Sequence, residues 1–207
     1  LGISLNLVGD INKSIYHHKS AVSIDPKSSL LLETLLFNSN YSPDMSAEEI
    51  FDYYKQYDNQ FGLPHKSQWK PFTQPKVLKK KLKIGYVSPD FRNHSMMNFL
   101  LPIITHHDYL QFEIFAFAEL KKEDSISFEY KSLVDHWIRT DQMNDDQLVE
   151  KIRELEIDIL VDLAGHTRGN RLKVFAQKPA PVSLSWWIGF GYTTGLSAID
   201  YFLTDEV

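Results

Sequence analysis

Cysteine is absent from the 207-residue sequence, which excludes disulfides and thiolate metal ligands and fits a reducing compartment such as the cytoplasm. Long apolar runs are also absent. None approaches the ~18–20 residues that a membrane-spanning helix needs, so we predict no membrane association. Basic residues number 22 against 27 acidic ones. The net charge of −5 disfavours nucleic acid as a partner, because nucleic-acid binding usually depends on a basic face.

The composition is otherwise typical of a packed globular protein, with 43% hydrophobic and 24% charged residues. The chain begins with Leu1, and its first residues lack the basic stretch and the small-residue cleavage site of a signal peptide. We therefore expect a piece of a longer protein. No His-x-x-x-His pair stands at ligand spacing with a carboxylate, so we expect no metal site.

The first 28 residues fit the end of a tetratricopeptide repeat. That repeat places Leu-Gly in its first helix, small residues where its helices touch, and proline near its end. Here Leu1 and Gly2 take the first place, Ser14 and Ala21 the small positions, and Pro26 the end. The alternative is an arbitrary helical hairpin. Because one repeat cannot bury its own apolar face, we expect further repeats upstream.

Residues 29–81 are predicted to form a helical junction and a linker. Apolar residues recur at helical spacing in the first part, and a second helix follows Ser46, a good N-cap with Glu49 in capping-box position. Three prolines and a basic cluster then mark the crossing to a new domain.

Residues 82–207 alternate between strand and helix patterns. Near-continuous apolar strands separated by helices predict a parallel sheet covered on both faces, a Rossmann-like α/β fold. One of the helices between strands is predicted over residues 124–137. The predicted strands carry the segments "KIGYVS", "FEIFAFA", "DILVDL", "VSLSWWI" and "YFLTD".

Three loops of this lobe are rich in glycine, histidine, threonine and asparagine. They read "SPDFRNHS", "AGHTRGNR" and "GFGYTTG", and each follows a predicted strand. In open parallel sheets the ligand crevice lies at the carboxyl ends of the strands. We therefore expect the three loops to form one polar rim.

The first of these loops carries Asp90, Asn93 and His94 ahead of a predicted helix. Asn93 is placed to cap that helix, and Asp90 to accept a hydrogen bond from a neighbouring imidazole and so set its tautomer. The helix dipole would keep His94 neutral, able to act as a base or to donate to a sugar hydroxyl. The alternative is an ordinary capped turn with a satisfied histidine.

The second and third loops lack the fingerprints of nucleotide cradles. His166 and Thr167 stand between two glycines that permit a tight turn or a close approach to a ligand, and Arg171 is expected to pair with a carboxylate. In the third loop, backbone N–H groups can donate to sugar hydroxyls or phosphate oxygens. Either loop could instead be a plain connecting turn.

In combination these motifs resemble one known family. The amino-terminal catalytic lobe of O-linked N-acetylglucosamine transferases of the SPINDLY-like type has segments similar to "KIGYVSPDFRNHS", "HHDYLQFEIFAFA", "IDILVDLAGHTRGNRLKVFAQKPAPVSLSWWIGFGYTTG" and "DYFLTDE". The preceding repeat and "NYSPDMSAEEIF" look like the junction of the same family. The resemblance covers essentially the whole chain.

The resemblance implies an inverting glycosyltransferase that moves N-acetylglucosamine from UDP-GlcNAc to Ser or Thr of proteins. Such enzymes have two Rossmann-like lobes, the GT-B architecture. This chain would be the first lobe, with the second lobe missing after Val207, and alone it should not turn over. The resemblance also implies a protein acceptor bound through the repeats, a nucleotide-sugar donor, and no cofactor or obligatory metal.

The family's site residues carry over onto all three loops. Catalytic roles fall on Asp90 and His94, with the histidine near the sugar and the acceptor. Contacts to substrate fall on Asn93, His166, Thr167, Ile188, Gly189, Thr193, Thr194 and Gly195.

Two departures from the family pattern bear on the donor. Ser95 follows His94 where the family has proline, and Gly191 and Tyr192 replace Pro-Gly in the sugar loop, where a tyrosine could narrow the pocket. Two alternatives therefore stay open: protein O-fucosylation from GDP-fucose, and a non-catalytic repeat adaptor with a degenerate sugar site.

Overall fold

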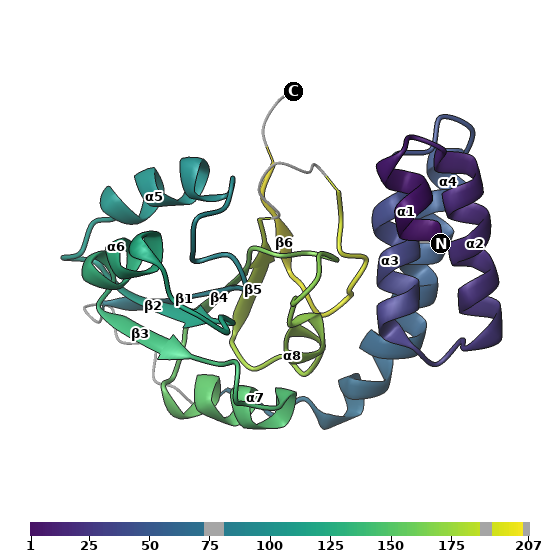
Figure 1. Ribbon diagram of the computed structural model, residues 1–207. Coiled ribbons are helices and arrows are strands. Elements are labelled where there is room, and N and C mark those ends of the chain that lie inside the picture. Colours follow the sequence, from purple (N-terminus) through teal and green to yellow (C-terminus); the bar gives the residue numbers. More distant parts are fainter. Residues whose placement is uncertain (73–80, 187–191, 205–207) are drawn as a thin grey trace.

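The computed structural model of the chain describes residues 1–72, 81–186 and 192–204. Figure 1 shows two parts: a bundle of four helices, α1 to α4, and an α/β lobe built on one sheet. The bundle stands beside the sheet on the side of β5, β6 and α8. Within the described ranges, no helix combines the length and the apolar character that crossing a bilayer requires.

The bundle follows the helical spacing of apolar residues in the sequence. Asp10, Ser28 and Ser46 cap three of its helices, each side chain accepting a backbone N–H of the first turn. The capping box predicted for Ser46 and Glu49 is confirmed. The helices are α1 (Gly2–Leu7), α2 (Ile11–Ile24), α3 (Ser29–Ser39) and α4 (Ala47–Tyr57).

A tight contact joins the first two helices. A Cβ added to Gly2 would lie 2.7 Å from the His18 ring, so a larger residue at this position would displace the ring. Ser14 and His18 on α2 are buried. The contact agrees with a helical hairpin, and the assignment of residues 1–28 to a tetratricopeptide repeat stays a prediction.

After α4 the chain continues directly into a π-helical turn, η1 (Asp58–Gly62), and a 3-10 turn, η2 (Leu63–Gln68). Trp69 follows and donates its Nε1–H to the carbonyl of Ala176 at 2.8 Å. The helical segment is therefore fastened to the lobe before the chain enters the sheet.

In the part of the chain that the structure describes, six parallel strands form the sheet, in the order β3-β2-β1-β4-β5-β6. The predicted parallel sheet is confirmed, and each of the five predicted strands is present. The bounds are β1 (Leu82–Ser88), β2 (Phe112–Ala118), β3 (His136–Arg139), β4 (Ile159–Asp162), β5 (Val182–Ser185) and β6 (Tyr201–Phe202).

Strand β3 corrects the prediction of a single helix over residues 124–137. The helix, α6 (Ser125–Leu133), ends at Leu133, and the chain becomes extended after it. Asp135 Oδ2 accepts the N–H of Ile114 in β2 at 2.8 Å, which holds the following residues at the edge of the sheet. A four-residue strand is too short for its alternation to be distinguished from the end of a helical pattern.

Helices cover both faces of the sheet (Figure 1). Ile84 and Tyr86 of β1 belong to the core on one face and Val87 to the core on the other, as the alternation of a strand requires. The first face carries α5 (Met97–Thr105) and α6 (Ser125–Leu133), and the second carries α7 (Asp145–Glu154) and α8 (Leu172–Ala176).

The core under α7 and α8 extends into the helical bundle. Buried side chains of the lobe and of the bundle belong to one apolar cluster, so the two parts share a core. The bundle contributes Ile15, Val22, Leu32, Leu35, Leu36, Tyr54 and Tyr57 to this cluster.

Candidate functional site

The strand order places a switch point between β1 and β4. The chain builds outward from β1 through β2 and β3, and then returns to place β4 on the other side of β1. Loops that leave the two strands at such a point diverge and leave a crevice at the carboxyl edge. Because the strand pairings are parallel, the loops after β1, β4 and β5 all leave from this edge.

Contacts link these three loops in pairs. Gly169 in the second loop has φ +86°, and a Cβ there would lie 3.0 Å from the Pro89 ring in the first loop. His166 in the second loop binds the carbonyl of Thr194 in the third at 2.8 Å. The predicted gathering at one edge is therefore confirmed for the described residues. Ile188 and Gly189 lie outside them.

The turn after β1 is fixed by a buried phenylalanine. Phe91 has no exposed surface, and its ring contacts those of Tyr130 and Trp137 with centroids 5.3 Å and 5.6 Å apart. Beside it, Asp90 donates its backbone N–H to Ser88 Oγ at 2.9 Å and pairs with Arg92 at 2.8 Å. Asp90 is therefore held in place with its carboxylate partly open to solvent.

His94 does not form the predicted hydrogen bond with Asp90. Its Nδ1 lies 3.9 Å from Asp90 Oδ2, beyond hydrogen-bond distance. The Nδ1 atom instead accepts the backbone N–H of Met96 at 3.3 Å. A neutral ring that accepts through Nδ1 carries its proton on Nε2. The side chain is 41% exposed, so it presents a donor at the rim.

Asn93 does not cap α5, contrary to its predicted role. The helix begins at Met97 with no side-chain cap. Instead, the Asn93 backbone N–H donates to Asp124 Oδ2 at 2.8 Å. The other oxygen of Asp124 accepts the N–H of Ser127 at 2.9 Å and so caps α6. One carboxylate therefore ties the turn after β1 to the start of α6.

Changing Asp124 to serine should separate these two functions. Serine caps a helix well but has a single oxygen, so the bond to Ser127 is retained and the bond to Asn93 is lost. We expect faster hydrogen exchange at the Asn93 amide in Asp124→Ser and Asp124→Ala, and a lower unfolding midpoint mainly in Asp124→Ala. These bonds also lower the pKa of the Asp124 carboxyl. Unchanged exchange at Asn93 in both variants would contradict the assignment.

Asp162, the last residue of β4, organises the second loop and was not among the predicted site residues. Its buried carboxylate accepts the N–H groups of Ala164 at 3.1 Å and Gly165 at 3.0 Å, and the Ser185 hydroxyl at 2.8 Å. Burial raises the pKa of this carboxyl. An aspartate that ends a buried strand three residues ahead of a glycine is the signal that could have identified it.

His166 lies below the rim, where its predicted contact with sugar has no direct path. It is 3% exposed, and its ring packs against those of Tyr54 and Tyr57, with centroids 5.5 Å and 4.6 Å away. Burial lowers its pKa to about 4, so the ring is neutral at pH 7. The helical segment covers it, an arrangement that the local sequence does not reveal. Thr167 beside it is half-buried and donates to the Ala164 carbonyl at 2.7 Å.

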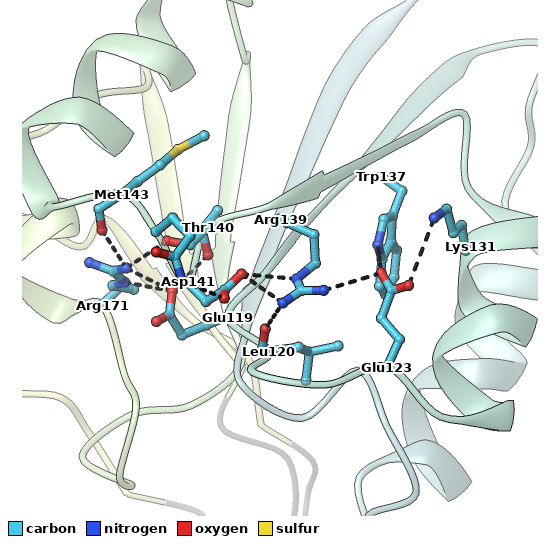
Figure 2. Close-up of polar contacts among 11 residues, drawn as sticks. Glu119, Leu120, Glu123, Lys131, Trp137, Arg139, Thr140, Asp141, Met143 and Arg171 are labelled. Atoms are coloured by element: carbon cyan, nitrogen blue, oxygen red, sulfur yellow. Dashed lines mark hydrogen bonds and ion pairs between the residues drawn. The ribbon is translucent and has the colours of Figure 1, made fainter.

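Arg171, at the end of the second loop, is confirmed as the partner of carboxylates (Figure 2). Figure 2 shows its guanidinium paired with Glu119, at 2.7 Å. The guanidinium also pairs with Asp145 at 2.7 Å. It also donates to the carbonyls of Thr140 at 3.0 Å and Met143 at 2.8 Å. Arg171 therefore ties together the chain beyond β2, the chain beyond β3 and the start of α7.

The third loop contains an exposed threonine directly before a buried one. Thr193 is exposed and its hydroxyl accepts the N–H of Gly195 at 3.0 Å. Thr194 is buried at 3% exposure, and Gly195 has φ +73°. Tyr192 donates its hydroxyl to the carbonyl of Asn40 at 3.4 Å. Its ring therefore reaches toward the helical bundle. Gly191 lies outside the described residues.

The rim as described offers hydroxyl and imidazole donors, the exposed guanidiniums of Arg92 and Arg168, and the partly open carboxylate of Asp90. Among residues 1–72, 81–186 and 192–204, no group of three histidine or acidic side chains is arranged to hold a metal ion. Such a surface suits a polar ligand with many hydroxyl groups.

Comparison with known proteins adds independent findings. Residues 59–207 match the family described as glycosyl transferase family 41. The chain is 35% identical over 188 residues to a probable UDP-N-acetylglucosamine–peptide N-acetylglucosaminyltransferase SPINDLY of Hordeum vulgare, a match covering 89% of this chain and 20% of that protein. It is 36% identical over 157 residues to the probable enzyme SEC of Arabidopsis thaliana, covering 72% of this chain and 15% of that protein.

A solved structure matches the whole chain. It is a mutant of the Thermobaculum terrenum O-GlcNAc transferase, similar with a TM-score of 0.90 and 29% identity over 100% of this chain and 39% of that one. The chain spans a fifth or less of the length of the two plant relatives named above.

Proposed function

Because the chain belongs to glycosyl transferase family 41, we propose that the whole protein transfers N-acetylglucosamine from UDP-GlcNAc to Ser or Thr hydroxyls of proteins. This chain supplies the amino-terminal lobe of the enzyme. The observation that carries the proposal is the gathering of three polar loops at the switch point of the sheet, in a chain whose structure resembles an O-GlcNAc transferase with a TM-score of 0.90. The plant relatives named above are UDP-N-acetylglucosamine enzymes by name, which favours that donor over GDP-fucose.

In this proposal the sugar and the acceptor hydroxyl lie over the turn after β1 and beside Thr193. The second lobe of the longer protein holds the nucleotide, so this lobe needs no phosphate cradle. The proposal includes catalysis without a metal and acceptor binding through helical repeats. Cytoplasmic location stays a prediction from the sequence.

His94 acts in this proposal as a hydrogen-bond donor. Its Nδ1 is occupied by the Met96 N–H, so the exposed Nε2 carries the proton and has no lone pair for a base. The Nε2–H can hold a hydroxyl oxygen at the rim. Asp90, paired with Arg92, keeps the turn in the conformation that presents His94.

Replacing His94 distinguishes a role as hydrogen-bond donor from a role as general base. Loss of one neutral hydrogen bond in His94→Ala should lower kcat/KM about tenfold, whereas loss of a general base would lower it ~10²–10⁴-fold. His94→Gln places an amide N–H near the position of Nε2, so we expect it to restore most of the activity. Equal and larger losses in both variants would contradict the donor role.

The proposed function is tested with the whole protein, an acceptor peptide containing Ser and Thr, and either UDP-GlcNAc or GDP-fucose. Mass spectrometry should show addition of N-acetylglucosamine from the first donor only. Transfer from GDP-fucose alone would replace the proposed donor. If calorimetry detected binding of neither donor, the protein would be a non-catalytic adaptor.

A further inference from the structure

The loop over residues 192–197 rests directly on the helical segment. A Cβ on Gly195 would lie 2.8 Å from Tyr54 Cβ and 2.9 Å from the Tyr54 carbonyl oxygen. The backbone of the loop therefore touches the backbone of α4, a contact that glycine with positive φ permits. Leu196 follows, buried in the apolar cluster that contains Tyr54 and Tyr57.

Asp58 of η1 binds the far end of this loop. Its Oδ1 accepts the backbone N–H of Ser197 at 3.1 Å and the Ser197 hydroxyl at 3.3 Å. Asp58 is 8% exposed while Ser197 is exposed, so these bonds are partly buried. Gly62, at the end of η1, leaves room for the carboxylate, because a Cβ there would lie 2.0 Å from Oδ1. A π-helical turn is rare, and such turns often occur at functional sites.

His166 binds the start of the same loop from the side of the lobe. Its Nε2 lies 2.8 Å from the carbonyl oxygen of Thr194. A carbonyl can only accept, so Nε2 carries the proton and donates. The rings of Tyr54 and Tyr57 pack around the imidazole, so α4 also determines where this donor points.

We propose that Asp58 and His166 are positioning residues for the donor site, and that through them the helical segment sets how tightly the enzyme binds its nucleotide-sugar. Both side chains lie below the rim and act through the backbone of residues 194–197, which they hold at its two ends. The inference rests on the proposed function, in which this loop contacts the sugar of the donor. It extends the role of the helical segment from acceptor binding to the geometry of the donor site.

Substitutions of Asp58 in the whole protein test this role. In Asp58→Ala, the Ser197 amide loses its acceptor, and we expect KM for UDP-GlcNAc to rise about tenfold, the effect of one lost hydrogen bond. The KM for the acceptor peptide should stay within a factor of two. Asp58→Asn retains an oxygen acceptor, so its KM for the donor should remain near that of the wild type.

Trp69→Phe is the matched control. It removes the bond from Trp69 Nε1 to the carbonyl of Ala176, 2.8 Å long, which also joins the helical segment to the lobe but involves neither Asp58 nor His166. Its KM for the donor should not change. An equal rise in Asp58→Ala and Trp69→Phe would mean that only general packing is involved, and no rise in either would overturn the proposal.

Hydrogen exchange of the Ser197 amide provides a readout that does not depend on activity. Exchange should be faster in Asp58→Ala than in the wild type and unchanged in Trp69→Phe, with no donor present. If the wild type transfers no sugar while this pattern is observed, the proposed function fails and the anchoring of the loop stands. If the exchange does not change, the anchoring itself is wrong.

Discussion

Replacement of Arg171 by methionine should lower the free energy of unfolding by about 3 kcal/mol, because it breaks a largely buried ion-pair network. The Arg171 side chain is 12% exposed, and its partners Glu119 and Asp145 are 21% and 33% exposed. Methionine fills much of the volume but removes one donor from each of two carboxylates and two backbone carbonyls, of which Glu119 keeps the Thr140 hydroxyl at 2.7 Å. Urea denaturation of the chain, with the wild type measured in parallel, gives this difference.

Arg139 is the matched control for this substitution (Figure 2). It is another arginine at the same edge of the sheet, it pairs with Asp141 at 2.8 Å, and its side chain is 35% exposed. Arg139 is more exposed than Arg171, so water can replace more of the bonds that it loses, and Arg139→Met should have a smaller effect. Equal losses of unfolding free energy in the two variants would show that the buried network around Arg171 contributes no more to stability than the bonds of Arg139.

Acid should destabilise the fold through His166 by about 3 kcal/mol between pH 7 and pH 4. Burial lowers the pKa of His166 from 6.5 to about 4 in the folded chain. The unfolded chain therefore binds a proton that the folded chain excludes. This contribution to stability is complete above the unfolded pKa, is lost as the pH falls through 6.5 toward 4, and changes no further below the folded pKa.

His166→Gln isolates this contribution from the carboxylates that titrate over the same range. Glutamine keeps an N–H near the Thr194 carbonyl and has no proton to gain. Subtracting its stability profile from that of the wild type removes the contribution of the other groups. The difference should grow as the pH falls from 7 to 4. Parallel profiles would show that His166 does not exclude the proton.

Local pattern was enough to predict the architecture. Apolar periodicity separates a helical segment from a parallel sheet, and Ser46 with Glu49 predicts the start of α4, because these signals involve neighbours in the sequence. The rule that ligands meet the carboxyl ends of parallel strands identified the three loops. Strand β3 was not predicted, because four residues are too few to show the alternation of apolar and polar side chains.

Residue roles inside the loops could not be predicted in the same way. The sequence identified His94 and His166 as polar residues of similar loops, yet one is 41% exposed in its side chain and the other is 3% exposed overall. Asp124 and Asp58 hold loops from 31 and 139 residues away in the chain. Nothing in the neighbourhood of either aspartate indicates its distant partner.

The sequence by itself determined the helical segment, the parallel sheet, and which edge of that sheet carries the polar loops. These properties depend on side-chain periodicity and on the direction of parallel strands. Only the tertiary structure decided which polar side chains meet solvent and which fix the backbone, because the shared core of bundle and lobe brings α4 over His166. Burial and long-range hydrogen bonds depend on that packing, and packing joins residues that are far apart in the sequence.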